Sequence, residues 1–204
     1  MINVAYINIG SELTYDQLRE YENLLPDYRR EKIARYRFDS DKLRSLVAGL
    51  LIRWAIGDRE IIFGERDKPY LADGSLYFSV SHSGDIVAIA TDERELGVDV
   101  EVIPSTDRLK IADRFYHPTE RDYVHSSDDP ERAFCRVWTR KESYLKCTGE
   151  GISTDLTAFD TLSEPLNGRI VTLDLNGYCI SVCSSRPITE DDAYFSKLEL
   201  KEIV

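Results

Sequence analysis

The sequence is poor in the two residue types that most often hold zinc, with four cysteines and three histidines among 204 residues. The cysteines form no Cys-x-x-Cys pair, and the histidines do not supply ligand spacing near them, so a structural zinc site is not indicated. Nothing suggests export to an oxidising compartment, and we therefore expect reduced thiols. The cysteines are Cys135, Cys147, Cys179 and Cys183, and the histidines are His82, His117 and His125.

Long apolar runs are also missing. No stretch approaches the roughly 18 apolar residues that are needed to cross a bilayer. The first residues, Met1 to Tyr6, lack the basic start and the long apolar core of a secretory signal. The sequence thus predicts no membrane association, and we expect a cytoplasmic protein.

Positive charge is scarce overall, because 26 Lys and Arg residues stand against 37 Asp and Glu, which gives a net charge of −11. An acidic surface repels nucleic acid and anionic lipid, so neither is an expected partner. Residues 28–44 reverse this balance, with seven basic and three acidic residues. This stretch is either a solvated helical face or a site for a multiply charged anion, and composition leaves both interpretations open.

The apolar patterning predicts helices and strands that are mixed without strict β-α-β alternation, which favours an α+β fold. Both halves of the chain follow a loosely similar plan, and we expect an N-terminal half over residues 1–100 and a C-terminal half over residues 101–204. The expected helices cover residues 26–38, 40–57, 106–116, 118–126 and 130–147. The expected strands cover residues 2–9, 76–81, 86–91, 96–102, 169–175, 178–184 and 195–203.

Residues 96–102 read Leu-Gly-Val-Asp-Val-Glu-Val and alternate between apolar and other side chains. On a strand, this alternation places Asp99 and Glu101 on the same face, about 6.5–7 Å apart along the chain. Two carboxylates at that distance repel one another unless a cation or water screens them. The pattern therefore indicates either a site for a cation or an amphipathic strand whose polar face lies in water.

A second pattern lies in the helix expected over residues 130–147. Phe134, Trp138, Glu142 and Lys146 are spaced by four residues and share one helical face. Glu142 and Lys146 can be an ordinary surface ion pair. Because they continue an apolar stripe, they can also lie where the helix meets the core or a cleft.

Residues 79–84, Ser-Val-Ser-His-Ser-Gly, end a predicted strand. They do not match the Gly-x-Ser-x-Gly turn of serine hydrolases. Hydroxyls and a histidine at a strand end can bind phosphate oxygens, with a plain polar turn as the alternative. The sequence has no P-loop, Rossmann or kinase signature. Its carboxylates, scattered cations and histidine together suit metal-assisted chemistry on a phosphoanhydride.

Taken in order, these motifs resemble the 4′-phosphopantetheinyl transferases of the surfactin-synthetase-activating type. The family's Gly-[Val/Ile]-Asp-[Val/Ile]-Glu strand matches residues 97–101, and its Trp-x-x-Lys-Glu-[Ala/Ser]-x-x-Lys helix matches residues 138–146. The family's Ser-His-Ser matches residues 81–83. The resemblance spans residues 26–151, and we match no motif beyond them. It implies an enzyme with two similar α/β halves, related by a pseudo-twofold axis, and an active site in the cleft between them.

The resemblance also implies a site. Mg²⁺ would be held by Asp99, Glu101 and Glu142, with Glu142 also the favoured general base. Lys146 would stabilise the negative phosphate oxygens and is a candidate acid for the leaving group. Asp67 departs from the family, because glycine commonly precedes its Lys-Pro pair. The residues expected to hold coenzyme A, chiefly by its phosphates, are Arg29, Lys32, Arg44, Lys68, Ser81 and His82.

The implied reaction transfers phosphopantetheine from coenzyme A to a serine of an apo acyl or peptidyl carrier protein, and adenosine 3′,5′-bisphosphate leaves. The carrier can belong to fatty-acid, polyketide, nonribosomal-peptide or amino-acid biosynthesis. A non-catalytic coenzyme A- or carrier-binding protein of the same fold is one alternative, and an unrelated Mg²⁺-dependent phosphohydrolase is another. Because one chain supplies both halves of the cleft, we expect a monomer.

Overall fold

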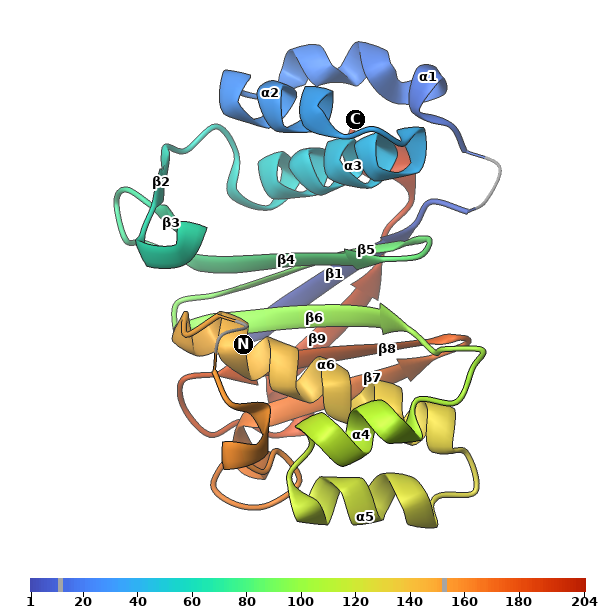
Figure 1. Ribbon diagram of the computed structural model, residues 1–204. Helices are drawn as coiled ribbons and strands as arrows, with labels where there is room; N and C mark the ends of the chain where they lie inside the picture. The colour runs from blue at the N-terminus through green and yellow to red at the C-terminus, as the bar shows by residue number, and fades with distance from the viewer. Residues whose placement is uncertain (11–12, 152–153) are drawn as a thin grey trace.

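Two β-sheets pack against each other in the middle of the molecule, and helices cover their outer faces (Figure 1). This computed structural model describes residues 1–10, 13–151 and 154–204. The first sheet has the order β4 (Tyr77–Ser83), β5 (Ile86–Asp92), β1 (Ile2–Asn8) and β9 (Ala193–Lys197). The second sheet has the order β6 (Leu96–Val102), β8 (Tyr178–Ser184) and β7 (Ile170–Leu175), and β2 (Ile61–Phe63) pairs with β3 (Pro69–Leu71) in a short ribbon.

The first sheet is covered by α3 (Asp39–Ile56), and α1 (Tyr15–Leu18) and α2 (Asp27–Arg35) lie on the outer side of α3 (Figure 1). The apolar stripe of α3 packs on this sheet, where Leu46 and Leu50 meet Ile7 and Ile89 in one buried cluster. The helix ends at Gly57, whose φ of 69° is one that glycine adopts without strain. The predicted helix over residues 40–57 is therefore confirmed to within a residue at each end. A short 3₁₀ helix, η1 (Arg19–Leu24), and the ribbon of β2 and β3 were not anticipated.

The second sheet is covered by α6 (Pro130–Thr148), with α4 (Leu109–Phe115) and α5 (Pro118–Ser126) outside it. Asp129 caps α6 by accepting a hydrogen bond from the Arg132 N–H, and Gly149 ends the helix in the left-handed conformation. The helix lies directly on β6, because a Cβ atom at Gly97 would stand only 2.2 Å from the Ser143 carbonyl oxygen. Glycine at position 97 therefore sets how closely α6 approaches the strand that carries Asp99 and Glu101.

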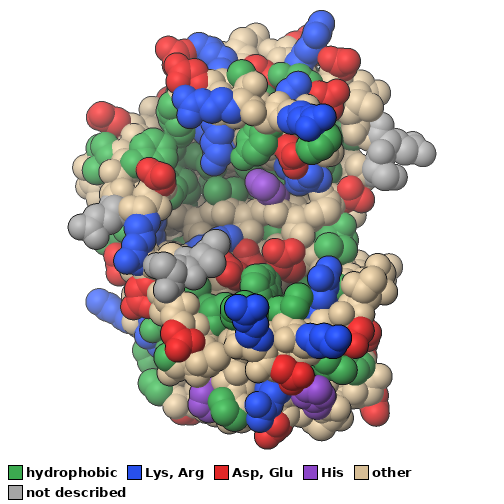
Figure 2. All heavy atoms as spheres, viewed as in Figure 1, with side chains coloured by type: hydrophobic (Ala, Val, Ile, Leu, Met, Phe, Trp, Pro, Cys, Tyr) green, Lys and Arg blue, Asp and Glu red, His purple; other side chains and the backbone are tan. Residues whose placement is uncertain are grey.

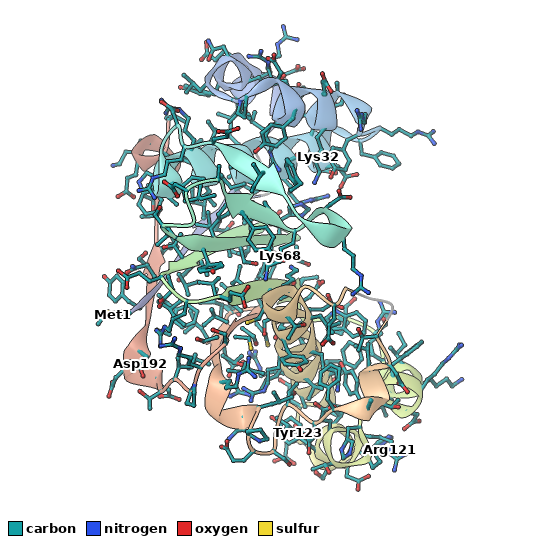
Figure 3. All side chains as sticks on the ribbon, turned by 90° about the vertical axis from the view of Figure 1, so that its left-hand side faces the viewer. Met1, Lys32, Lys68, Arg121, Tyr123 and Asp192 are labelled. Carbon is teal, nitrogen blue, oxygen red and sulfur yellow. The ribbon has the colours of Figure 1, made fainter. Side chains whose placement is uncertain are left out.

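The last strand, β9, returns to the first sheet. It pairs in parallel with β1, with Ile2 opposite Ala193, and Met1 and Asp192 lie side by side (Figure 3). The strand predicted over residues 195–203 is wrong beyond Lys197, because the chain there turns into a 3₁₀ helix, η6 (Leu200–Glu202). Ile203 then inserts into the apolar cluster beneath α3. These last residues thus complete the N-terminal side of the molecule.

The α+β class predicted from the sequence is confirmed by this arrangement. The pseudo-twofold relation and the division into residues 1–100 and 101–204 stay predictions. Hydrogen bonding does place β6, which begins at Leu96, with β8, and β9 with β1. In the ranges that the structure describes, no helix is both long and apolar enough to cross a membrane.

Candidate active site

A cleft of about 390 Å³ opens between the two sheets with their helices, and Figure 2 shows this hollow with Lys and Arg on its upper side and Asp and Glu on its lower side. Its upper side comes from α2, α3 and β4, and its lower side from β6 and α6. The lining residues are Arg29, Lys32, Ser45, Ala48, Val80, Ser81, His82, Asp99, Glu101, Trp138, Glu142 and Lys146.

We call Asp99, Glu101 and Glu142 the carboxylate wall. Asp99 is only 4% exposed, and its Oδ1 accepts hydrogen bonds from Lys146 Nζ at 2.7 Å and Ser81 Oγ at 2.8 Å. Its second oxygen, Oδ2, is buried and has no hydrogen-bond partner among the described residues. A buried carboxylate oxygen without a partner is costly, so this atom is prepared for a ligand that the protein itself does not provide.

The other two carboxyl groups experience the same environment. Burial raises the pKa of Glu101, the Asp99 carboxylate raises it further, and a hydrogen bond from Ser83 opposes this rise. Burial also raises the pKa of Glu142, and Asp99 and Glu101 add to it against the opposing charge of Lys146. Two carboxyl groups whose pKa is raised by burial and by the charge of a neighbouring carboxylate form an environment that a cation would stabilise.

The donor set fits a hard divalent cation, since carboxylate oxygens are what Mg²⁺ prefers and one of them has no partner in the part of the chain that the structure describes. In this conformation, however, no three Asp, Glu, His or Cys side chains in the described part of the chain converge on a single point as metal ligands. Lys146 instead supplies the positive charge nearest to Asp99. The residues therefore suit the ion in chemistry, and the side chains of Asp99 and Glu142 would have to turn towards it to complete the site.

We call Arg29, Lys32 and His82 the cationic wall. Arg29 is 8% exposed, and its Nη2 donates to the Ser45 carbonyl oxygen at 2.8 Å. Lys32 is exposed at the mouth, above the level of Lys68 in Figure 3. The pKa of His82 is lowered to about 4, first by desolvation and then by the charges of Arg44 and Lys146. The imidazole is therefore neutral at neutral pH.

Two of the predicted coenzyme-binding residues lie outside this cleft. Arg44 lines a neighbouring cavity, where it pairs with Asp41 and donates to the Gly84 carbonyl oxygen at 3.2 Å. Lys68 lines an adjoining cavity with Glu142 and Lys146, and its Nζ donates to the Cys147 carbonyl oxygen at 2.6 Å, at the end of α6. The residue before it, Asp67, has a φ of 59°, which explains why glycine suits that position.

Both plain interpretations of the acidic motifs are wrong. Asp99 does not lie on a strand face in water, because α6 covers that face and leaves it 4% exposed. Lys146 forms its ion pair with Asp99 rather than with Glu142, and the lysine is only partly exposed. Both motifs therefore face the cleft.

Sequence reasoning missed some residues of the site. Ser45, on α3, is 2% exposed, and its Oγ lacks a partner among the described residues although it lines the cleft. The sequence did offer a signal for Ser45, because this serine stands directly between the basic Arg44 and Leu46, which belongs to the apolar stripe of the helix. Ser79 and Ser83 do not line this cleft, and they were noted in their motif without a role. Their spacing of two from Ser81 on a strand places all three on one face.

Comparison with known protein families yields two adjoining matches. The model described as "4′-phosphopantetheinyl transferase, N-terminal" matches residues 12–94, and the "4′-phosphopantetheinyl transferase superfamily" model matches residues 95–194. The two matches meet immediately before β6, at the point where the chain passes from the first sheet to the second.

Curated proteins with the same description are similar to this chain. The 4′-phosphopantetheinyl transferase psf-1 of Bacillus pumilus is 34% identical over 79% of this chain and 76% of its own length. The 4′-phosphopantetheinyl transferase Sfp of Bacillus subtilis strain 168 is 28% identical over 91% and 93%. Another 4′-phosphopantetheinyl transferase of Bacillus subtilis is 34% identical over 64% of this chain, which spans 63% of that relative's length.

Proposed function

The chain belongs to the 4′-phosphopantetheinyl transferase family, and we propose that it moves phosphopantetheine from coenzyme A to a serine of an apo acyl or peptidyl carrier protein in a Mg²⁺-dependent reaction. The family, and with it the prediction of a coenzyme A-using transferase, is confirmed by the comparisons. The identity of the carrier, the metal and the roles of individual residues are proposals.

One observation carries the proposal for the site: the buried Oδ2 of Asp99 has no hydrogen-bond partner among the described residues, and Asp99 lines a cleft whose opposite wall is cationic. Coenzyme A is a polyanion, and Arg29, Lys32 and the neutral His82 would bind its phosphates by charge-assisted hydrogen bonds. Ser81 would donate to the same oxygens when it is released from Asp99. Lys68 would reach them by exchanging its present acceptor, the Cys147 carbonyl oxygen.

The carboxylate wall would hold Mg²⁺ through Asp99, Glu101 and Glu142. When bound there, the ion would neutralise charge on the diphosphate of coenzyme A. Glu142, whose pKa is raised by burial, would accept the proton of the carrier serine as its oxygen attacks the β-phosphorus. Lys146 would keep its ammonium group near the phosphate oxygens and would protonate the leaving adenosine 3′,5′-bisphosphate.

The test is the identity of the products. Apo-carrier proteins from several pathways are incubated with coenzyme A and Mg²⁺, and both the carrier and the nucleotide are analysed by mass spectrometry. We expect a carrier with one phosphopantetheine on serine and an equal amount of adenosine 3′,5′-bisphosphate. Cleavage of coenzyme A with an unmodified carrier would indicate a phosphohydrolase instead. Binding of coenzyme A without any product would indicate a non-catalytic binding protein.

We also propose that the chain acts as a monomer in the cytoplasm. The cleft is lined by residues of a single chain, so the proposed site needs no second subunit. The proposed substrates, coenzyme A and carrier proteins of biosynthesis, support this location. Light scattering checks the first point, and an obligate trimer would contradict it.

A further inference from the structure

Three serines on β4 form a row that faces β6. Ser79, Ser81 and Ser83 alternate along the strand, and Figure 1 shows β4 and β6 side by side across the junction of the two sheets. Ser79 Oγ accepts a hydrogen bond from the Val98 N–H at 3.0 Å. Ser81 Oγ donates to Asp99 Oδ1 at 2.8 Å. Ser83 Oγ donates to Glu101 Oε2 at 2.7 Å and accepts from the Val102 N–H at 3.2 Å.

This row compensates for an open sheet edge. β6 pairs through its backbone with β8, and it lies at the end of its sheet, so its other edge faces β4. Backbone N–H groups at such an edge need acceptors, most of all where they are buried, as at Val98. Serine hydroxyls of a strand from the other sheet provide them at Val98 and Val102. The row thus fixes the register between the strand of the phosphate-binding motif and the strand of the carboxylates.

The three serines differ in what they hold. Ser81 is part of the proposed coenzyme site, and Ser79 bonds to the backbone of β6. Ser83 bonds both to that backbone and to a carboxylate. Because the Val102 N–H is directed at a lone pair of its oxygen, the single hydroxyl proton of Ser83 is left to point at Glu101.

Glu101 depends on this one contact more than Asp99 does on any of its own. Asp99 is buried and held by both Lys146 and Ser81. Glu101 is half-buried near the end of β6, beside Val102, which is 44% exposed. A free glutamate side chain at such a position would lose its fixed rotamer and turn to solvent, which its greater conformational entropy favours. Ser83 holds one oxygen of this side chain and leaves the other available.

We infer that Ser83 is a positioning residue that orients the Glu101 carboxylate for the cation, an inference that rests on the proposed function. Ser83 does not line the cleft, and it would itself touch neither the metal nor the coenzyme. It acts through the ligand, in the way that outer hydrogen bonds orient metal-binding carboxylates in other sites. Loss of its hydroxyl should therefore weaken metal binding while the fold is retained.

The experiment measures Mn²⁺ binding by electron paramagnetic resonance in the presence of coenzyme A, with Mn²⁺ as a probe for a site of carboxylate oxygens. Ser83→Ala should weaken Mn²⁺ binding roughly tenfold or more. Ser79→Ala is the matched control, because it also removes a hydroxyl that accepts from the β6 backbone but touches no carboxylate. Ser83→Thr restores the hydroxyl and should bind within about threefold of wild type.

Thermal unfolding of each variant separates positioning from general destabilisation. We expect Ser79→Ala to lower Tm at least as much as Ser83→Ala, since each loses one acceptor for a β6 N–H and the Val98 N–H is the more buried of the two. Equal Mn²⁺ affinity in Ser83→Ala and wild type would overturn the inference and leave the proposed function intact. Equal weakening by Ser79→Ala and Ser83→Ala would overturn it as well. If the wild-type protein binds no Mn²⁺ and Asp99→Ala leaves the Mn²⁺ spectrum unchanged, the proposed metal site itself is wrong, and this inference with it.

Discussion

The two walls of the cleft hold their charges in different ways. On the carboxylate wall, Asp99 is fixed by two hydrogen bonds and lies under α6, which Gly97 admits to within backbone contact of β6. On the cationic wall, Lys32 and His82 are exposed, and only Arg29 is buried. The difference separates two tasks. A long exposed cation such as Lys32 can follow a flexible polyanion, whereas groups that act on the reacting phosphorus must be held in place.

The largest expected effect comes from removing the most tightly held group of the carboxylate wall. Asp99→Ala should reduce the rate of carrier modification by roughly 10³-fold or more, because the proposed ion and Lys146 both lose their common partner. The fold should persist, since the change also removes a buried oxygen that has no partner within residues 1–10, 13–151 and 154–204. The rate is measured over a Mg²⁺ titration, with circular dichroism as the check on folding.

Asp16→Ala is the control, because Asp16 is exposed on α1 and pairs with Arg19 at the surface. It should leave the rate unchanged. Wild-type turnover with an unchanged Mg²⁺ dependence in Asp99→Ala would show that β6 does not bind the metal.

The next comparison is between Lys146, which pairs with the carboxylate wall, and the two cations of the cationic wall. Lys146→Ala should lower kcat by roughly 10²-fold with a smaller effect on coenzyme A binding, because its charge matters most as the phosphate bond breaks. Arg29→Ala combined with Lys32→Ala should instead raise KM for coenzyme A much more than KM for dephospho-coenzyme A. Steady-state kinetics with both substrates measures the two patterns. If both variants change kcat and KM in the same way, the two walls do not have the separate tasks described above.

A smaller effect is expected when the packing behind the carboxylate wall is disturbed and no charged residue is replaced. A Cβ atom at Gly97 would stand 2.2 Å from Ser143 O and 2.4 Å from Cys147 N, which are backbone atoms of α6. Gly97→Ala should therefore push α6 outward and cost about 1–3 kcal/mol of unfolding free energy, with a fall in kcat. Chemical denaturation measures the free energy.

Gly168→Ala is the matched control for this substitution. Its Cβ would meet a Glu164 carboxylate oxygen at 2.8 Å, at the end of a side chain that can move away. We expect a stability change within about 0.5 kcal/mol there. Equal losses from the two substitutions would mean that the approach of α6 to β6 is not specially tight.

The smallest expected effect concerns the protonation of His82 in the cationic wall. The pKa of His82 is lowered to about 4, so its ring carries no charge at neutral pH. A bound polyanion should raise this pKa, because it favours the protonated ring. Because the folded value lies below the ordinary value of about 6.5, the contribution of His82 to stability is lost as pH falls from about 6.5 to about 4. An NMR titration of the ring protons, assigned with His82→Gln and repeated with coenzyme A, measures both values. A pKa near 6.5 in the free protein would contradict the desolvation of this ring.

Local patterns in the sequence were sufficient for the elements that carry the site. Alternation along residues 96–102 predicted which side chains of β6 share a face, and the spacing of four predicted that Glu142 and Lys146 share a face of α6. Contacts between distant segments were not predictable in this way. Nothing in the sequence says that Lys68 reaches the Cys147 carbonyl oxygen, 79 residues away, or that Ser83 meets Glu101. Such contacts arise from the packing of the two sheets, which single-strand periodicity does not encode.

The return of β9 to the first sheet bears on how the protein is made on the ribosome. Residues 2–92 supply β1, β4 and β5, but β1 keeps an uncovered edge until Ala193–Lys197 pairs with it. The apolar cluster under α3 is also incomplete until Ile203 has been added to the chain. A nascent chain that has emerged only as far as β6 therefore exposes an open strand edge and an incomplete core, which are the features that attract other chains. The N-terminal side, although synthesised first, completes its fold only after the C-terminal side has been synthesised.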